Sequence, residues 1–369
     1  MKKILFILGT RPDAIKCAPL IIELKKTKTF SVKVCSTGQH KEMLKPVFDF
    51  FEIDVDFDLK IMTKNQSLIT SISQTILGLE KIKDKFLPDF VIVQGDANPA
   101  IGGSLFAFYN KIPIIHLEAG LRSGDMNSPY PEEGNRIVVS HLANFHLAPT
   151  RLAANNLKKE NIKKNIFIVG NTVIDSLFIA KNKINKFRPS RDLKKINFDK
   201  KIILITGHRR ENFGKPIEEI LKAIKELAIK YSDIEFVYPV HLNPNVKNPV
   251  EKILSKQDNI HLINPLDYPS LVYLMNKSYL VITDSGGIQE EAPSLGKPIV
   301  VTRNTTERSE GVVAGTAILV GTNPKKLKSA VEKLIKNKEF YKKMSKIKSP
   351  YGDGKSSKKI KTILLRLIK

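Results

Sequence analysis

Residues 89–117 read DFVIVQGDANPAIGGSLFAFYNKIPIIHL, and this stretch indicates the fold of the chain. The apolar runs at 89–95 and 112–117 have the length and the Val and Ile content of buried β-strands. A helix is expected between them, beginning just after Gly95 and Asp96. A strand, a helix and a second strand in this order predict a βαβ unit with parallel strands.

The same alternation continues along the rest of the chain. Helical periodicity is visible at 66–86, 215–231 and 324–335, and it predicts parallel sheets with helices on both faces. The expected strands lie at 3–9, 31–37, 89–95, 112–117 and 165–170, and then at 201–207, 234–240, 259–265, 279–286, 297–302 and 316–321.

We expect two doubly wound, Rossmann-like α/β domains because the strand pattern restarts near residue 200, after a Lys- and Asn-rich stretch. The expected domains are residues 1–171 and 172–352, with a linker within 172–200. Residues 359–368 read KIKTILLRLI, part of an amphipathic helix expected at about 353–369, which has no partner left in the second domain.

The composition favours a protein with a sizeable core in a reducing compartment. Of the 369 residues, 42% are hydrophobic, but no apolar run approaches the ~20 residues of a membrane span. The opening MKKILFILGTRPD resembles a signal peptide, although its apolar run, Ile4 to Leu8, is too short. Cys17 and Cys35 are too few for a disulfide framework or a metal-ligand cluster. We therefore expect a cytoplasmic protein without a metal site.

The net charge of +24 raises the alternative of a nucleic-acid-binding protein. Most of the excess lies in residues 151–200, with a net charge of +9, and in residues 325–369, with +13. Both segments are rich in lysine, whereas a specific nucleic-acid site also uses arginine and aromatic side chains for base edges and stacking. Solvated helix faces are the favoured interpretation, so no nucleic-acid partner is expected.

Two expected strands of the first domain end in polar motifs. The first runs into GTRPDAIK, in which Pro12 suits a first helical turn, and Arg11 and Lys16 suit a phosphate or pyrophosphate at the helix N-terminus. The dinucleotide fingerprints GxGxxG and Walker A are absent. Asp96 follows another strand, where it is either the N-cap of a helix or a catalytic carboxylate.

A dense group of charges follows the strand at 112–117. Residues 114–136 read IIHLEAGLRSGDMNSPYPEEGNR, with glycines and prolines that interrupt regular structure. Because open α/β sheets bind ligands beyond the carboxyl ends of their strands, this stretch is a candidate active site, and a solvated loop is the alternative. Its charged residues are Glu118, Arg122, Asp125, Glu132, Glu133 and Arg136.

The second domain carries a candidate nucleotide site. In TDSGGIQEEA, Ser285, Gly286 and Gly287 would let a phosphate approach the backbone amides of a helix N-terminus. Glu291, further along that helix, can accept hydrogen bonds from ribose hydroxyls. His208, followed by two arginines in TGHRRE, indicates an anion site, although a structural histidine is the alternative.

Taken together, the motifs resemble those of the non-hydrolysing UDP-N-acetylglucosamine 2-epimerases. They run in order from residue 9 to about residue 321. The resemblance implies two domains arranged as in GT-B glycosyltransferases, with the active site in the interdomain cleft and the last helix completing the first domain. It also implies a homodimer that uses no cofactor and supplies surface polysaccharide precursors. The matching motifs are GTRPDAIK, QGDANPA, HLEAGLRSGDMNSPYPEEGNR, APT, VGNTVIDSL, TGHRRENFG, YPVHLNP, PLDY, LMNKS, TDSGGIQEEAPSLGKP and TERSEGV.

The resemblance also implies roles for individual residues. Three carboxylates would surround the hexose, and the nucleotide would be held mainly by the second domain. The implied catalytic residues are Asp96, Glu118, Glu132 and His208, the last beside the pyrophosphate. The implied substrate-binding residues are Arg11, Lys16, Arg136, Ser285, Gly286, Gly287, Glu291 and Arg308, with the uracil beside the Leu266 backbone and the Leu271 side chain.

Many bacterial members of this family bind a second UDP-N-acetylglucosamine as an activator. The corresponding residues here would include Gln39, Arg209 and His241, together with Glu132. Glu42 and Asn65 stand where the family pattern implies Gln and Arg, so this regulatory site departs from the pattern.

The C2 hydrogen of the substrate is not adjacent to a carbonyl, so direct deprotonation is too costly. Elimination of UDP to 2-acetamidoglucal, followed by re-addition, needs carboxylates for proton transfer on two faces and cations for the departing diphosphate. Three alternatives remain open: a 2-epimerase of a related UDP-2-acetamido sugar, a hydrolysing epimerase that releases N-acetylmannosamine, and a GT-B glycosyltransferase.

Overall fold

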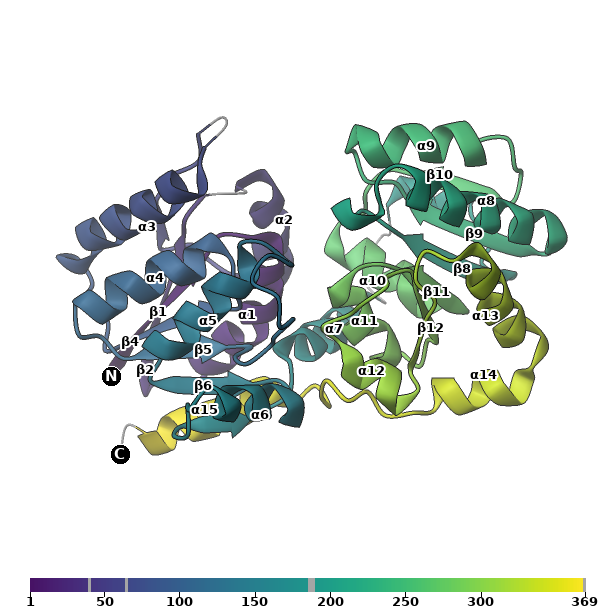
Figure 1. Ribbon diagram of the computed structural model, residues 1–369. Helices are drawn as coiled ribbons and strands as arrows, with labels where there is room; N and C mark the ends of the chain where they lie inside the picture. Colours follow the sequence, from purple (N-terminus) through teal and green to yellow (C-terminus); the bar gives the residue numbers. More distant parts are fainter. Residues whose placement is uncertain (39–40, 64–65, 185–189, 368–369) are drawn as a thin grey trace. The chain divides into compact units, whose positions relative to one another are not determined.

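The structure, a computed structural model, describes residues 1–38, 41–63, 66–184 and 190–367. It divides into two compact units: unit 1 comprises Met1–Ile179 and Tyr351–Lys369, and unit 2 comprises Ala180–Pro350 (Figure 1). The boundary expected after residue 171 lies at the start of helix α7 (Thr172–Lys183), whereas the units divide inside that helix.

Unit 1 is built on a seven-stranded sheet with the strand order β3-β2-β1-β4-β5-β6-β7, in which neighbouring strands are parallel. Parallel strands covered by helices are apolar on both faces, and every residue of β5 is indeed buried. The elements are β1 (Lys2–Leu8), α1 (Arg11–Lys25), β2 (Phe30–Ser36), α2 (Lys41–Phe51), β3 (Phe57–Asp58), α3 (Leu68–Lys83), β4 (Phe90–Gln94), α4 (Asn98–Tyr109), β5 (Ile114–Leu117), α5 (Glu132–Leu142), β6 (Phe145–Ala148), α6 (Arg151–Lys159), β7 (Ile166–Ile168), α7 and α15 (Ser356–Leu367).

Helices flank this sheet (Figure 1). Helices α3, α4 and α5 lie side by side, and their apolar side chains form one core with those of β1 and β4. Helix α1 contacts both α2 and the C-terminal helix α15. The amides of Ser356 and Ser357, in the first turn of α15, donate to Asp175 of α7 at 3.1 and 2.8 Å. Helix α15 is therefore fastened to unit 1 at its first turn.

Unit 2 is built on a six-stranded parallel sheet with the order β10-β9-β8-β11-β12-β13. Helices α8, α9 and α13 pack their apolar faces with β8, β9 and β11 into one core. The elements are η2 (Arg191–Lys195), β8 (Lys201–Thr206), η3 (Arg210–Asn212), α8 (Lys215–Lys230), β9 (Ile234–Pro239), α9 (Pro244–Leu254), β10 (Ile260–Ile263), α10 (Tyr268–Lys277), β11 (Leu280–Thr283), α11 (Gly286–Ser294), β12 (Ile299–Val301), α12 (Ser309–Ala314), β13 (Ala317–Leu319), α13 (Pro324–Lys336) and α14 (Lys338–Ser345).

Both sheets are doubly wound, as predicted from the alternating strands and helices. The strand order reverses between β1 and β4 in unit 1 and between β8 and β11 in unit 2. Crevices beyond the carboxyl ends of strands at such reversal points are where open α/β sheets bind ligands. Among the described residues, no helix is both long and apolar enough to span a membrane.

Candidate active site

The first helix of unit 1 is positioned by the motif that follows β1. Thr10 caps α1 by accepting from the amide of Asp13, and the Asp13 carboxylate accepts in return from the amide of Thr10 at 3.0 Å. This reciprocal capping box starts the helix at Arg11, with Pro12 in the first turn. A Cβ at Gly9 would lie only 2.1 Å from Cγ of Pro99 in α4, so only glycine lets the two reversal-point segments approach.

Glu118 follows β5 in a strained, left-handed conformation with a φ of 65°. Such a backbone costs a non-glycine residue about 1–2 kcal/mol, and strain of this kind clusters at functional sites. Its buried carboxylate accepts from Lys16 Nζ at 2.6 and 2.5 Å, from Asn171 Nδ2 at 3.1 Å and from Gln94 Nε2. Three side chains, from α1, from β4 and from the residue before α7, therefore fix the position of this carboxylate.

Asp96 is not the N-cap of α4, so that interpretation is wrong: the residue before the helix is Ala97. The Asp96 carboxylate is instead held by Arg136 of α5, whose Nε donates to Oδ2 at 3.0 Å and whose second terminal nitrogen donates to the same oxygen. The Asn135 amide group also donates to the Asp96 carbonyl at 2.9 Å. Both Arg136 contacts fall on Oδ2, and Oδ1 accepts no hydrogen bond from the residues that the structure describes.

The third expected carboxylate, Glu132, is the first residue of α5. Its Oε2 is shielded from solvent and has no hydrogen-bond partner within the part of the chain that the structure describes. A buried, unpaired carboxylate oxygen is costly in an ordinary surface loop, and it is an exception that asks for an explanation. This observation favours an active site over the alternative of a solvated loop.

Unit 2 places the Ser-Gly-Gly segment at its own reversal point, directly after β11. Ser285 is the N-cap of α11, and among the described residues its side chain makes no capping hydrogen bond with the first turn. A Cβ on Gly286 would lie 3.1 Å from the Arg308 guanidinium, so glycine admits this cation to the helix N-terminus. The N-terminal amides and a neighbouring guanidinium form an anion-binding arrangement.

Arg308 is held by two buried carboxylates. Its Nε donates to Glu290 at 2.9 Å, and one terminal nitrogen donates to Glu307 at 2.7 Å. Burial opposes ionisation of Glu307, but the charges of Arg308 and Arg303 outweigh it and lower its pKa to about 2. The guanidinium is thus fixed in place, which sequence reasoning did not foresee.

The other expected nucleotide contacts of unit 2 are Glu291, Leu266, Leu271 and His208. Glu291 is 5% exposed and accepts a hydrogen bond from the Tyr268 hydroxyl at 2.9 Å. Tyr268 opens helix α10, which also carries the half-buried Leu271, and Leu266 is buried just before it. His208 follows β8, and its backbone amide donates to Asp284 at 3.0 Å.

Comparison with known proteins gives the family. The family model described as UDP-N-acetylglucosamine 2-epimerase matches residues 22–365. The chain is 50% identical over 367 residues to the UDP-N-acetylglucosamine 2-epimerase of Salmonella borreze, covering 98% of this chain and 97% of that protein. This chain belongs to the UDP-N-acetylglucosamine 2-epimerase family. The membership expected from the sequence motifs is therefore confirmed.

Solved structures of the epimerase family share the fold along the whole chain. The crystal structure of the UDP-GlcNAc 2-epimerase from Neisseria meningitidis bound to UDP-GlcNAc has a TM-score of 0.93 at 48% identity, covering 99% of this chain and 100% of that one. The Methanocaldococcus jannaschii UDP-GlcNAc 2-epimerase in complex with UDP-GlcNAc and UDP has a TM-score of 0.83 at 35% identity, covering 99% of each chain.

The expected regulatory residues of this epimerase are only partly described. Gln39 and Asn65 lie outside the described residues, as does the side chain of Glu42. The rings of His208 and His241 stack with centroids 5.5 Å apart. Burial lowers the pKa of His208, although the Asp284 charge opposes this, so the imidazole is neutral near pH 7.

Four residues that sequence analysis did not assign a role support the epimerase carboxylates. Gln94 and Asn171 hold Glu118, and Glu133 contacts Arg136. His116 is fully buried, and desolvation lowers its pKa to about 3 although its bond to the Gly95 carbonyl opposes the shift. The only sequence signal for Glu133 is its i, i+3 spacing from Arg136 on a helix.

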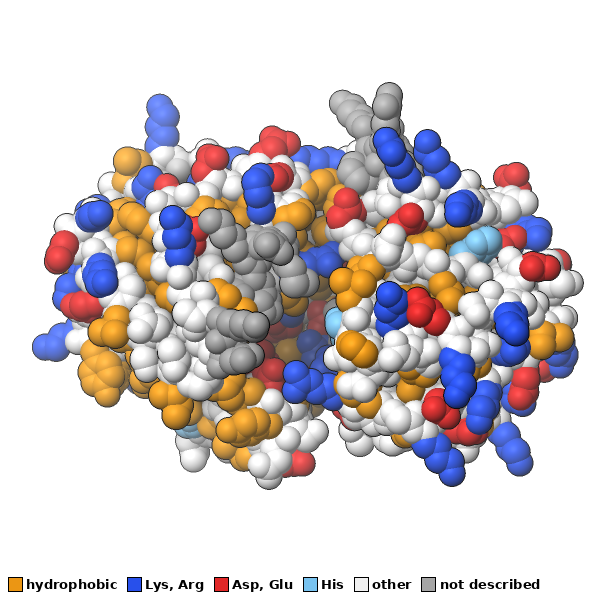
Figure 2. Space-filling view, turned by 90° about the horizontal axis from the view of Figure 1, so that it is seen from above, with side chains coloured by type: hydrophobic (Ala, Val, Ile, Leu, Met, Phe, Trp, Pro, Cys, Tyr) orange, Lys and Arg blue, Asp and Glu red, His pale blue; other side chains and the backbone are white. Residues whose placement is uncertain are grey.

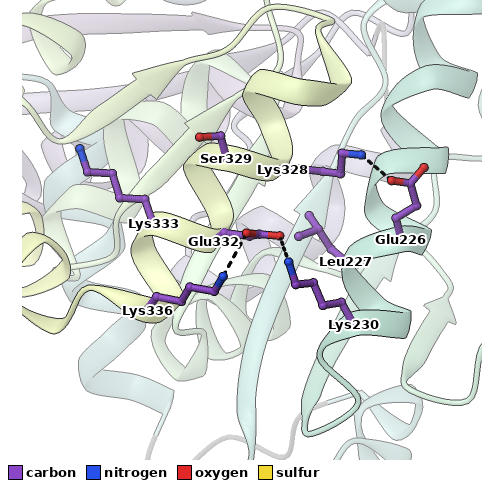
Figure 3. Close-up of a pocket in the computed structure, with 8 residues that line it drawn as sticks. All are labelled: Glu226, Leu227, Lys230, Lys328, Ser329, Glu332, Lys333 and Lys336. Atoms are coloured by element: carbon purple, nitrogen blue, oxygen red, sulfur yellow. Dashed lines mark hydrogen bonds and ion pairs between the residues drawn. The ribbon is translucent and has the colours of Figure 1, made fainter.

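The lysine and arginine side chains of the epimerase lie among other side chains on its surface. On the face shown in Figure 2, lysine and arginine side chains are interspersed with acidic and apolar ones. Figure 3 shows the groove between α8 and α13, where lysines from both helices pair with acidic residues of the opposite helix. Exposed pairs of this kind contribute little to stability, as expected for solvated helix faces. The residues that line the groove are Glu226, Leu227, Lys230, Lys328, Ser329, Glu332, Lys333 and Lys336.

Proposed function

We propose that this chain interconverts UDP-N-acetylglucosamine and UDP-N-acetylmannosamine by eliminating UDP and adding it back. The observation that carries the proposal is the environment of three carboxylates of unit 1: Asp96 and Glu118, just after β4 and β5, and Glu132, at the start of α5. Two of these carboxylates are held by the largely buried cations Lys16 and Arg136, and the third has a shielded oxygen with no partner in the described part of the chain. The ligands named for the Neisseria and Methanocaldococcus enzymes support the choice of substrate.

In the proposed reaction, the bond between C1 of the hexose and UDP breaks while a base removes the C2 proton. The products of this step are 2-acetamidoglucal and UDP. A proton then reaches C2 from the opposite face and UDP adds back at C1, which inverts C2 and balances the reaction without a redox cofactor. The transition state carries positive charge near C1, which a carboxylate stabilises.

The hydrogen bonds of unit 1 favour different roles for the three carboxylates. Both oxygens of Glu118 are engaged by donors, so it is suited to act as a fixed negative charge near C1. Among the described residues, Asp96 and Glu132 each keep an oxygen without a hydrogen-bond donor, so they are suited to exchange a proton with C2. Proton transfer on two faces requires two such groups.

Unit 2 would hold the nucleotide in this proposal. The amides of Gly286 and Gly287 and the guanidinium of Arg308 would bind the diphosphate, and Glu291 would bind the ribose. The neutral imidazole of His208 would donate to the diphosphate as it leaves. Arg11 and Lys16 would add positive charge from unit 1.

The direct test is incubation of the purified chain with UDP-N-acetylglucosamine, UDP-N-acetylmannosamine and related UDP-2-acetamido sugars, followed by NMR of the products. We expect the two named sugars to interconvert from either side, with UDP still attached. Release of free N-acetylmannosamine, or conversion of only another UDP-sugar, would contradict the proposal. The Asp96→Asn and Glu132→Gln variants should each lose about 10²-fold in turnover and still bind UDP.

The family resemblance supports two further proposals about the state of the enzyme. We propose a homodimer, which analytical ultracentrifugation would detect as a species of twice the 41.5 kDa chain mass. We also propose a cytoplasmic location, because a nucleotide-sugar substrate is made there and because Cys17 and Cys35 are both free. Fractionation that recovers the native chain outside the cytoplasm would contradict the second proposal.

A further inference from the structure

The carboxylate of Glu133 joins the two parts of unit 1 that carry Asp96 and Glu118. It is 1% exposed, in the first turn of α5. One oxygen accepts from the amides of Ser123 and Gly124 at 3.0 Å each, in the segment that follows Glu118. The other accepts from a terminal nitrogen of Arg136 at 2.9 Å.

Arg136 links Glu133 to Asp96, because it donates hydrogen bonds to both carboxylates. The Arg136 guanidinium is 4% exposed and forked between two carboxylates, with Glu133 on one terminal nitrogen and Asp96 on the other nitrogens. A buried guanidinium that loses one anchor can pivot about its remaining contact. The orientation of Asp96 therefore depends on Glu133, although Glu133 need not touch the substrate.

We infer that Glu133 is a positioning residue for the proton transfers at C2, acting on Asp96 through Arg136. This inference rests on the proposed epimerase function and assigns a role to a residue outside the expected catalytic set. A purely structural role, in which Glu133 only anchors the segment at Ser123 and Gly124, is the competing explanation. The two explanations differ in whether Glu133 affects turnover through its contact with Arg136.

The test is a double-mutant cycle with Glu133→Gln and Arg136→Gln, assayed by NMR turnover of UDP-N-acetylglucosamine. Glutamine keeps the shape and one carbonyl acceptor for the loop amides, but it removes the charge that holds the guanidinium. We expect Glu133→Gln to lower kcat about 10- to 100-fold, the effect of a small misplacement of a reacting group, with KM changed less than about threefold. In the Arg136→Gln background, the same change should cost less than about threefold.

A matched control is Glu160→Gln, which breaks another carboxylate–guanidinium pair of unit 1. Glu160 accepts from Arg122 at 2.6 and 2.7 Å, and the same guanidinium donates to the Ser140 hydroxyl at 3.1 Å. Its kcat should stay within about twofold of the wild type. Calorimetric UDP binding and circular dichroism check that each variant is folded, and Glu133→Asp replaces Glu133→Gln in the cycle if the glutamine variant does not fold.

The inference would be overturned if Glu133→Gln kept the wild-type kcat, or if the losses of kcat in the two single variants multiplied in the double variant. Either result would leave the proposed function intact. A wild-type chain that converts no UDP-2-acetamido sugar would overturn the proposed function, and the inference with it. The positioning role is supported if the losses of kcat in the single variants do not multiply in the double variant and all variants still bind UDP.

Discussion

Replacing Glu118 by glutamine should destabilise unit 1 by about 3–5 kcal/mol, because it removes one partner from a buried ion pair. The side chains of Lys16 and Glu118 are only 12% and 5% exposed. Without the carboxylate, the Lys16 ammonium loses its anion, and the glutamine NH₂ group has to face the donors of Gln94 and Asn171. For a unit of this size, each kcal/mol shifts the melting temperature by about 2–4 °C, so a fall of roughly 6–20 °C is expected.

Differential scanning calorimetry and far-UV circular dichroism measure this shift, since the chain contains no tryptophan for fluorescence. Lys16→Met should cost a similar amount, because it removes the cation that faces the buried carboxylate. The double variant should lose at least about 2 kcal/mol less stability than the sum of the two single variants, because it contains neither charge of the pair. Lys45→Met is the control: its pair with Asp49 is 73% and 60% exposed, so a loss below about 1 kcal/mol is expected.

A Glu118→Gln variant as stable as the control, or single losses that simply add in the double variant, would refute this reasoning. Either result would mean that the carboxylate is not held by Lys16. The same variant should also turn over about 10²-fold more slowly and release UDP and 2-acetamidoglucal on long incubation, if Glu118 stabilises the charge near C1.

Three further predictions concern the nucleotide, the pH dependence of stability and regulation. Glu291→Ala should weaken UDP binding in calorimetry and raise KM more than it lowers kcat, because its proposed partner is the ribose; unchanged UDP affinity would remove that role. Burial raises the pKa of Asp13 from 3.8 to about 6, against its hydrogen bonds to Thr10. Between pH 4 and 6 the folded state therefore keeps a proton that the unfolded state releases. The protonated Asp13 stabilises the folded state fully below pH 4, and at most about 3 kcal/mol of this stability is lost as the pH rises through 6. Asp13→Asn should remove that loss in urea titrations between pH 4 and 6, and an unchanged pH dependence would contradict the assignment. UDP-N-acetylglucosamine should activate the reverse reaction less than about twofold, because Glu42 adds a carboxylate and Asn65 lacks a cation for a second diphosphate; a strict requirement for the activator would overturn this expectation.

The sequence was sufficient to predict the fold because parallel strands are continuous apolar runs between helical patterns. All eleven expected strands are present in the structure. The two missed strands are the ones without such a run: β3 has two residues, and β6, read as FHLA, contains a histidine and no β-branched residue. Pairing with a neighbouring strand, β2 for β3 and β5 for β6, rather than local propensity, makes these segments strands.

The candidate site was only partly predictable, for a physical reason. Residues directly after a strand can be placed at the sheet edge from the sequence alone, as with Glu118 after β5. Contacts between segments far apart in the chain cannot be placed in this way. Asn171 is an example, because it lies 53 residues from the Glu118 carboxylate that it holds. Asp96 shows the same limit, because its N-cap interpretation was locally reasonable and was wrong only because Arg136 reaches it from α5.

The most direct test of the account is the fate of the C2 hydrogen when UDP-N-acetylglucosamine is incubated with the chain in D₂O. If an enzyme carboxylate in exchange with solvent reprotonates C2 from the opposite face, proton NMR should show UDP-N-acetylmannosamine with deuterium at C2. The deuterium content of the first product molecules should already be close to complete, since UDP cannot add back before C2 receives a new proton. Epimerised product that retains its original C2 hydrogen would contradict elimination and re-addition, and with it the roles given to Asp96 and Glu132.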